Sequence, residues 1–107
     1  MKFRVHMLAF GSDNEVREVD VPDAVVLRER DSLESLLGLV YYYGQNDTQP
    51  QDHCSVSIGD VIEMPDGKYY RVDSTGFSRL APDVLQTYKN TPRRDRDLVA
   101  TWGERIY

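Results

Sequence analysis

Residues 55–77, SVSIGDVIEMPDGKYYRVDSTGF, constrain the fold more than any other part of the chain. Two apolar runs flank the residues PDG at 65–67, in which proline fixes φ and glycine tolerates positive φ. In the second run Tyr70 and Val72 alternate with neighbours that point the other way, as in a strand with one buried face. The stretch therefore predicts a β-hairpin, and the residues STGF at 74–77 predict a further turn into a short third strand.

The N-terminal segment predicts a second hairpin. Phe3, Val5 and Met7 occupy every second position, which places them on one face of a strand. The residues GSDN at 11–14 are a turn cluster, and the valines that follow predict a returning strand. Because the spacing of these valines breaks strict alternation, we expect either a bulge or a short strand, which ends before Pro22.

Residues 32–43 predict an amphipathic helix. Its apolar residues lie at helical spacing and form one stripe: Leu33, Leu36, Leu37, Val40 and Tyr41. Asp31, followed three residues later by Glu34, has the pattern of a capping box, and Gly44 offers a place for the helix to end. Gly38 lies inside the helix, where it costs about 1 kcal/mol relative to alanine, and we interpret it as a point of close packing against a sheet.

The C-terminal part of the chain has weaker patterns. Pro82 suits the first turn of a helix, and the residues that follow it predict a short one. Residues 91–97 predict a solvated loop in which arginines at 93, 94 and 96 are paired with the interleaved aspartates. We expect three apolar residues beyond this loop to pack back onto the core: Leu98, Val99 and Trp102.

Together these elements predict an α+β fold. We expect a small, mostly antiparallel sheet, one main amphipathic helix at about 32–43 packed on it, and a short C-terminal helix. The 107 residues have the length of one domain. In this interpretation residues 81–107 are an extension that packs on a core formed by residues 1–80.

Composition and charge argue against several functions. With 40% hydrophobic and 29% charged residues the chain has a globular composition, and no apolar run is long enough to span a membrane. The net charge of −5 is concentrated at 13–34, where eight acidic residues accompany three basic ones. Because such a segment repels phosphate, direct nucleic-acid binding is disfavoured. The single cysteine cannot form an internal disulfide, and the N-terminus lacks a signal-peptide pattern, so we expect a cytoplasmic protein.

The sequence assembles no catalytic, cofactor-binding or metal site. Adjacent residues of an extended chain point to opposite faces, so His53 is badly placed to deprotonate Cys54, which we interpret as buried or half-buried. Two histidines and one cysteine have no metal-binding spacing, and of the carboxylates Asp60, Asp66 and Asp73, the first two occupy turns. Phosphate-binding loops and the GxSxG motif are also absent, so we expect no cofactor.

Aromatic and acidic residues form the candidate interaction surface. Residues 41–43 are three tyrosines that span most of a helix circumference, so at least one must face outward, where tyrosine favours protein interfaces. The default interpretation of these tyrosines is core packing with the hydroxyl groups in solvent, and the alternative is a partner surface. We predict a surface for a protein partner or a second copy of the chain, made of Tyr41, Tyr42, Tyr43, Tyr69, Glu15, Glu18 and Asp20.

The order of helix, polar loop and hairpin resembles the YodL-like domain, a small domain found in proteins of plasmids, phages and integrative elements. The resemblance covers about residues 2–80 and depends on two motifs, S-x-S-x-G-D-V and Y-x-V-D-S-x-G-F. The residues that match are Ser55, Ser57, Gly59, Asp60, Val61, Tyr69, Tyr70, Val72, Asp73, Ser74, Gly76 and Phe77. The family often has serine where this chain has Gly59. The resemblance implies a mobile-element setting and no established enzymatic activity.

The leading hypothesis is a non-enzymatic interaction module that binds a protein partner or self-associates. The alternative is an acidic decoy that mimics the charge of DNA, although −5 over 107 residues is modest for this purpose. An uncharacterised enzyme ranks below both. If a small-molecule site exists, we expect it at Asp73 and Ser74, for which the simplest interpretation is a side-chain-to-backbone turn.

Overall fold

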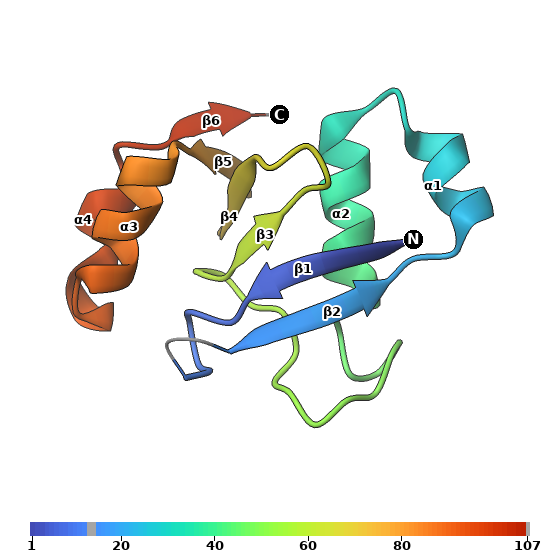
Figure 1. The fold of residues 1–107 in the computed structure, drawn as a ribbon, viewed down its shortest axis with the longest axis horizontal. Coiled ribbons are helices and arrows are strands. Elements are labelled where there is room, and N and C mark those ends of the chain that lie inside the picture. Colours follow the sequence, from blue (N-terminus) through green and yellow to red (C-terminus); the bar gives the residue numbers. More distant parts are fainter. Residues whose placement is uncertain (13–14, 107) are drawn as a thin grey trace.

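The computed structural model describes residues 1–12 and 15–106, in which six strands form one antiparallel sheet with helices on both faces (Figure 1). The strands are β1 (Lys2–His6), β2 (Val16–Asp20), β3 (Val61–Glu63), β4 (Tyr69–Asp73), β5 (Gly76–Leu80) and β6 (Glu104–Ile106). The helices are α1 (Asp23–Glu29), α2 (Leu33–Tyr43), α3 (Pro82–Asn90), the 3-10 helix η1 (Arg93–Asp95) and α4 (Arg96–Ala100). The strand order is β2-β1-β3-β4-β5-β6, so the predicted α+β class is confirmed.

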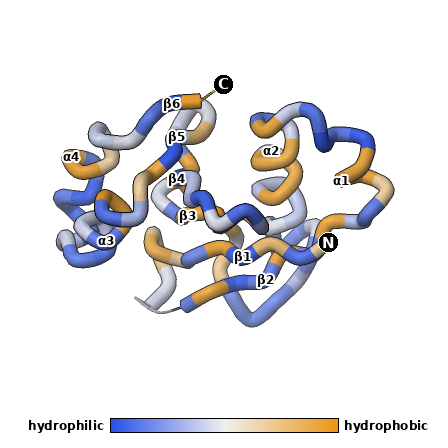
Figure 2. Tube along the Cα trace, turned by 45° about the horizontal axis from the view of Figure 1, so that its top comes forward, coloured by the Kyte–Doolittle hydropathy of each residue, from blue (hydrophilic) through white to orange (hydrophobic). Residues whose placement is uncertain are grey.

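The larger core lies between α2 and one face of the sheet. Val5 pairs with Ile62, and Ile62 pairs with Tyr70, so these side chains point the same way in three neighbouring strands. Leu37 and Val40 of α2 are fully buried in the same cluster, and Figure 2 shows how hydrophobic α2 is along its length. Each such burial contributes about 1.5–3 kcal/mol, so tertiary packing holds this helix in place.

The helix predicted at 32–43 is confirmed as α2, with two corrections at single residues. The N-cap is Ser32, whose Oγ accepts a hydrogen bond from the Ser35 N–H at 3.2 Å, and not Asp31. Ser32 has the extended backbone of an N-cap, which directs its side chain at the first turn. The close packing predicted at Gly38 is wrong, because a Cβ added there would meet no atom within 4 Å.

The hairpins follow the prediction. Strands β1 and β2 pair in unbroken register from Lys2 opposite Asp20 to His6 opposite Val16. β2 is therefore a short strand and contains no bulge. Part of the predicted turn between them, residues 13–14, lies outside the described residues. β3 and β4 join through the PDG turn, where Gly67 has a φ of +84° that favours glycine.

The second face of the sheet is covered by α3 and α4. Leu85 and Tyr88 of α3 pack with Val99 of α4 and with Leu80 of β5, and this cluster is the smaller core. The predicted short C-terminal helix is confirmed as α3. Residues 91–97, predicted to be a loop, instead contain η1 and the start of α4.

Two of the three residues predicted to pack back onto the core do not do so. Val99 is buried, but Leu98 and Trp102 are 71% and 64% exposed. For Leu98 the reason is geometric: α4 is only five residues long and turns one side to the sheet, which leaves the other side in solvent. Trp102 lies beyond α4, in the turn that leads to β6. The helices α1 and α4 and the strand β6 were not predicted, because each is too short to carry a clear periodic pattern.

Side chains of a loop close the outer edge of the sheet at β2. The Asp20 N–H donates to Gln49 Oε1 at 3.0 Å, and Gln49 Nε2 donates to the Asp20 carbonyl at 2.8 Å, so one side-chain amide replaces a neighbouring strand. Gln51 Nε2 donates to the Glu18 carbonyl at 2.8 Å. Because exposed strand edges pair with other chains, these contacts protect β2 from unwanted association.

His6 leads us to predict a pH dependence of stability. Its Nε2 lies 3.0 Å from Glu63 Oε1, and its ring centroid lies 6.0 Å from that of Tyr69. Burial lowers the pKa of His6 from the ordinary value of 6.5 and outweighs the opposing effect of Glu63. The unfolded chain therefore binds a proton near pH 6.5 that the folded chain binds only at lower pH. Stability should fall as the pH drops below this value.

Urea unfolding above and below pH 6.5 checks this expectation. The variant His6→Gln should lose the part of the pH dependence that His6 contributes, whereas His53→Gln keeps it because His6 remains. An NMR titration of His6 with a midpoint above 6.5 would show that Glu63 dominates and that the expected sign is wrong.

Candidate functional site

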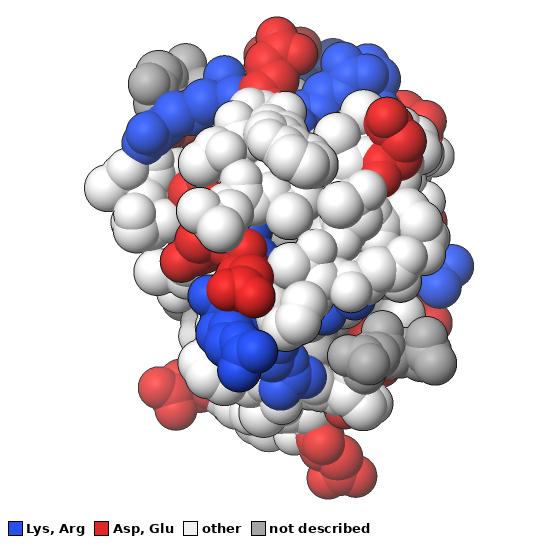
Figure 3. Space-filling view, turned by 90° about the vertical axis from the view of Figure 1, so that its left-hand side faces the viewer, with Lys and Arg blue, Asp and Glu red and all other residues white. Residues whose placement is uncertain are grey.

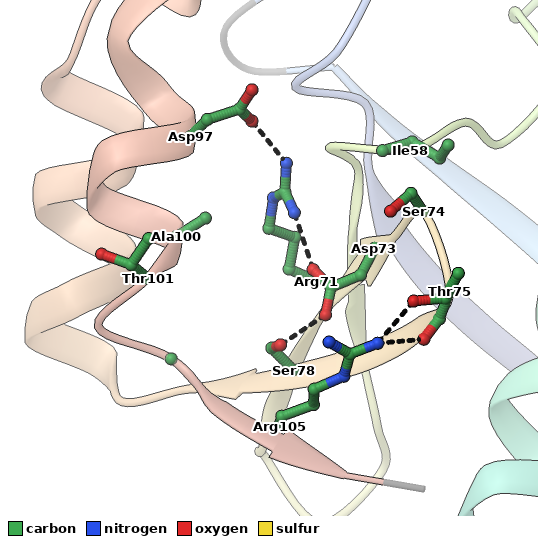
Figure 4. A pocket seen from close by; sticks show the side chains of 11 residues that line it. Ile58, Arg71, Asp73, Ser74, Thr75, Ser78, Asp97, Ala100, Thr101 and Arg105 are labelled. Carbon is green, nitrogen blue, oxygen red and sulfur yellow. Dashed lines mark hydrogen bonds and ion pairs between the residues drawn. The ribbon is translucent and has the colours of Figure 1, made fainter.

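A polar pocket of about 440 Å³ lies between α4 and the turn that joins β4 to β5 (Figure 4). Arg71 and Asp73 enter it from β4, Ser78 from β5 and Asp97 from α4. We call it the Arg71 pocket. The rest of its wall is formed by Ile58, Ser74, Thr75, Ala100, Thr101, Gly103 and Arg105.

Arg71 stands at the centre of this pocket and is almost fully buried. Its Nη1 donates to Asp73 Oδ1 at 2.6 Å, and its Nη2 donates to Asp97 Oδ1 at 2.8 Å. Its Nε donates to the Tyr88 hydroxyl at 3.2 Å. Burial disfavours the charge, but the hydrogen bonds with Tyr88 and Asp73 outweigh it, so the pKa of Arg71 is raised and the side chain stays charged.

Asp73 uses both carboxylate oxygens inside the pocket. One accepts from Arg71, and the other accepts a hydrogen bond from the Ser78 hydroxyl. The predicted side-chain-to-backbone turn at Asp73 is therefore wrong, because its partners are side chains of β4 and β5. The pocket does include both Asp73 and Ser74, the two residues at which the sequence places any small-molecule site.

Two smaller hollows adjoin the Arg71 pocket, and Ile58 lines all three. One, of about 220 Å³, shares Asp73 and Ser74 with it and adds Tyr41 and Phe77. The other is about 250 Å³ in volume, shares Arg71 and Asp97 with the pocket, and adds the exposed side chain of Phe10. Figure 3 views the molecule from the side of α3 and α4: acidic and basic side chains adjoin one another there, beside a broad area of uncharged ones.

The loop that carries Ile58 is held firmly on both sides. The buried carboxylate of Asp60 accepts from the Ser57 N–H at 2.8 Å and from the Ala9 N–H at 2.9 Å, which ties the loop to the turn that follows β1. Burial raises the pKa of Asp60, although these two hydrogen bonds oppose the shift. Gly59 has a φ of +97° and donates its N–H to the Val72 carbonyl at 2.9 Å. Ile58 itself remains 50% exposed.

Arg96 positions α4, and hence Asp97, beside the pocket. It is only 5% exposed, and its guanidinium donates to the carbonyls of Leu8, Tyr88, Lys89 and Thr91 at 2.7–3.0 Å. Three of these carbonyls belong to the C-terminal end of α3 and its cap, where a cation stabilises the helix dipole. The prediction of a solvated arginine loop is therefore wrong for Arg96.

A second buried arginine holds the long loop that precedes Ile58. Arg17 points from β2 into the larger core and is fully buried. It donates to Asn46 Oδ1 at 2.9 Å and to the carbonyls of Gln49 and Cys54 at 2.6 and 2.9 Å. Burial lowers the pKa of Arg17.

The neighbouring residues His53 and Cys54 lie in the loop that Arg17 holds. His53 Nδ1 lies 3.1 Å from Glu15 Oε2, which directs the imidazole at the start of β2. The side chain of Cys54 is exposed, so its predicted burial is wrong: the loop is held by its backbone carbonyl, which accepts from Arg17, and this leaves the side chain in solvent.

The residues of the predicted interaction surface lie in three separate places. Tyr41 and Tyr42 are exposed on α2, as predicted for part of the tyrosine run, whereas Tyr43 is partly buried against the larger core. Tyr69 is half-buried on the opposite face of the sheet, where it packs on the smaller core beside His6.

The acidic residues of that surface lie along β2 or directly before it. Glu15 contacts His53, and Glu18 lies 3.8 Å from Lys2 Nζ. Asp20 accepts a hydrogen bond from the N-terminal ammonium of Met1 at 3.2 Å. Glu18 and Asp20 are exposed, but each of these carboxylates faces a basic group. Only Tyr41 of the predicted surface residues lines one of the three hollows.

Most residues of the YodL-like motifs build the scaffold around the pocket. Ser55 Oγ accepts from the Asn46 N–H at 2.8 Å, and Ser57 Oγ donates to the Ser55 carbonyl at 3.0 Å. Gly76 has a φ of +112°, which suits the turn between β4 and β5. Val61, Tyr70, Val72 and Phe77 are buried in the two cores. Asp73 and Ser74 are the motif residues with polar groups that line the pocket.

Sequence reasoning missed six polar residues of the pocket: Arg71, Thr75, Ser78, Asp97, Thr101 and Arg105. Alternation along β4 does place Arg71 and Asp73 on one face, and this was the available signal. Asp97 lies 26 residues after Arg71 and reaches it only because α4 folds over the sheet. No local pattern connects the two.

Among residues 1–12 and 15–106, no group of three or more histidine, cysteine or acidic side chains is arranged to hold a metal ion. No helix in the same part of the chain has the length and apolar character needed to cross a membrane.

Fold and site together define an α+β domain in which one antiparallel sheet lies between two helical layers and carries a polar pocket at the β4–β5 turn. In comparisons with protein-family models, with curated proteins and with solved structures, no match was found. The resemblance to the YodL-like domain stays a prediction that depends on the motif residues.

Proposed function

We propose that the protein is a non-enzymatic interaction module that binds a protein partner along the surface around Ile58. The observation that carries this proposal is the exposed Ile58 side chain, which lies where three hollows adjoin and stands on a firmly held loop. An apolar side chain on a fixed backbone binds a partner at a low entropic cost, because little is left to order on association.

The polar groups of the Arg71 pocket support binding more than chemistry. Both oxygens of Asp73 already accept hydrogen bonds, and one of these bonds is donated by the Ser78 hydroxyl. None of the described residues that line the pocket is a histidine that could act as a general base for this serine. Such an arrangement offers directed hydrogen bonds at the rim of an apolar contact, which is typical of protein interfaces.

The proposed surface differs from the one predicted from sequence. It keeps Tyr41 and adds Ile58 and Phe10, which are exposed and line the adjoining hollows. Tyr69 and the acidic residues of β2 are not part of it. The proposal includes a cytoplasmic location, which the single cysteine Cys54 supports. It also includes a mobile-element setting, which the resemblance to the YodL-like motifs supports.

The acidic-decoy alternative receives less support from the arrangement of charges. The carboxylates of Asp20 and Asp23 both accept hydrogen bonds from the N-terminal ammonium, at 3.2 and 2.6 Å. With Glu15 beside His53 and Glu18 beside Lys2, much of the acidic segment faces nearby basic groups and does not present an isolated negative surface.

Ile58→Asp should weaken partner binding at least tenfold, because it places a charge where an apolar contact forms. The matched control is Leu98→Asp, which changes an exposed leucine on the outer side of α4 that does not line any of the three hollows. Cross-linking and affinity capture with the wild-type chain identify the partner, and titration with both variants measures the loss. Light scattering detects self-association.

Two results would overturn the proposal. One is a strictly monomeric protein that retains no partner. The other is a partner that Ile58→Asp and Leu98→Asp affect equally, since this would place the contact elsewhere.

A further inference from the structure

The three donor sides of the Arg71 guanidinium have different partners. Nε meets the buried Tyr88 hydroxyl, and Nη1 meets Asp73, whose side chain is largely buried within the sheet. Both contacts are internal to the fold. Nη2 points toward the outer part of the pocket and meets Asp97, as Figure 4 shows.

Asp97 is a different kind of partner from Asp73. Its side chain is 91% exposed, although it is bound at 2.8 Å to an arginine whose own side chain is 10% exposed. An exposed carboxylate loses little free energy when it leaves an ion pair and is hydrated instead. Salt bridges of exposed groups accordingly contribute little to stability. The contact therefore covers the outer donor of Arg71 without fixing it permanently.

We propose that Arg71 Nη2 is the recognition point for a carboxylate of the partner, and that Asp97 occupies this position until the partner replaces it. This inference depends on the proposed function and adds the chemical class of the group that enters the pocket. The hydroxyl groups of Ser74 and Thr75 line the same pocket and offer further donors, and Ile58 provides an apolar contact beside it.

The charges of the pocket favour a carboxylate over a phosphate. Two arginines, at 71 and 105, and two aspartates, at 73 and 97, line it, so the charged groups balance. A carboxylate that replaces Asp97 on Arg71 keeps a single negative charge at that donor. A phosphate monoester brings nearly two negative charges close to Asp73, which disfavours it.

The test uses small probes, so it does not require the partner. Acetyl-glutamate amide presents a side-chain carboxylate, acetyl-glycine presents a terminal carboxylate, and acetyl-glutamine amide is the neutral control. Each is titrated into ¹⁵N-labelled wild type, Asp97→Asn and Asp95→Asn. Asp95 is the matched control, because it is an exposed aspartate two residues away that does not line the pocket.

We expect a carboxylate probe to shift the Arg71 Nε–H and the backbone amides of 73–76, with weak affinity. Removing the competing charge in Asp97→Asn should strengthen binding about two- to fivefold, in keeping with the small contribution of an exposed ion pair. Asp95→Asn should leave the affinity within error. The relative affinities of the two carboxylate probes indicate whether a side chain or a chain terminus is preferred.

The inference is overturned if Asp97→Asn leaves the affinity unchanged, if Asp95→Asn strengthens it equally, or if inorganic phosphate binds more tightly than either carboxylate. Any of these results leaves the Ile58 experiment untouched. If Ile58→Asp and Leu98→Asp reduce the affinity for the partner equally, that result instead counts against the interaction surface.

Discussion

Replacing Arg96 with methionine is expected to lower the free energy of unfolding by about 3 kcal/mol, since hydrogen bonds of charged groups each contribute roughly 1.5–3 kcal/mol. Methionine fills part of the space but donates no hydrogen bond. The carbonyls of Leu8, Tyr88, Lys89 and Thr91 then lose a shared donor inside the fold. For a domain stabilised by about 5–15 kcal/mol in total, this is a large fraction.

Arg94→Met is the control for this experiment. Arg94 lies two residues earlier, its side chain is largely exposed, and its contact is with Asp95 at 3.8 Å. Urea unfolding should show a change within about 0.5 kcal/mol for this variant. If Arg96→Met lowers the free energy of unfolding as little as Arg94→Met does, the four carbonyls find other donors and Arg96 does not anchor α3 and α4.

The variant Arg17→Met should lose about 2–3 kcal/mol of stability, because buried acceptors without donors cost roughly 1–3 kcal/mol each. Removing a charge that is costly to bury offsets part of this loss. The acceptors left behind are Asn46 Oδ1 and the carbonyls of Gln49 and Cys54. Arg17 Nε has no hydrogen-bond partner in the described residues, so removing the guanidinium relieves one unsatisfied donor and only partly offsets the loss.

A second readout distinguishes a local effect from a general one. The three acceptors all belong to residues 46–54, so limited proteolysis should cut this loop faster in Arg17→Met than in the wild type. The control is Arg4→Met on the neighbouring strand β1, where the side chain is exposed. If both variants are as stable and as resistant as the wild type, the loop is held by its other contacts.

The two arginines indicate how the pocket is supported. Arg96 holds α4, which carries Asp97, and Arg17 holds the loop that leads to Ile58. Neither lines the Arg71 pocket, so substitutions at these positions change stability directly and ligand binding only through the position of α4 or of the loop.

Much of the sheet and the main helix followed from local pattern. The stripe that contains Leu37 and Val40 has helical period, and the alternation at Tyr70 and Val72 has the period of a strand. Such periods arise from the geometry of a single element, so they can be recognised without knowing the partner. The exposure of Leu98 was mispredicted, because a five-residue helix has only one covered side and its pattern does not say which. Trp102 lies in the turn after that helix, where no period indicates burial.

The candidate site was only partly predictable. Asp73 and Ser74 were named, and both line the pocket. Asp97, which pairs with Arg71, was predicted to lie in a loop. Tyr69 was assigned to the same interaction surface as the tyrosines of α2, but it lies on the opposite face of the sheet. These errors share one cause: they depend on which element covers which face.

The amino-acid sequence by itself determined the two hairpins, the helix at 32–43 and the α+β class, because hydrophobic periodicity and turn residues act over a few positions. Only the tertiary structure decided which arginines are buried. Arg17 and Arg71 each have acceptors from distant segments, and Arg96 links the end of α3 to the distant Leu8, while Arg94 lies in solvent. An arginine can be buried where such acceptors converge on it, and convergence is a property of the assembled fold.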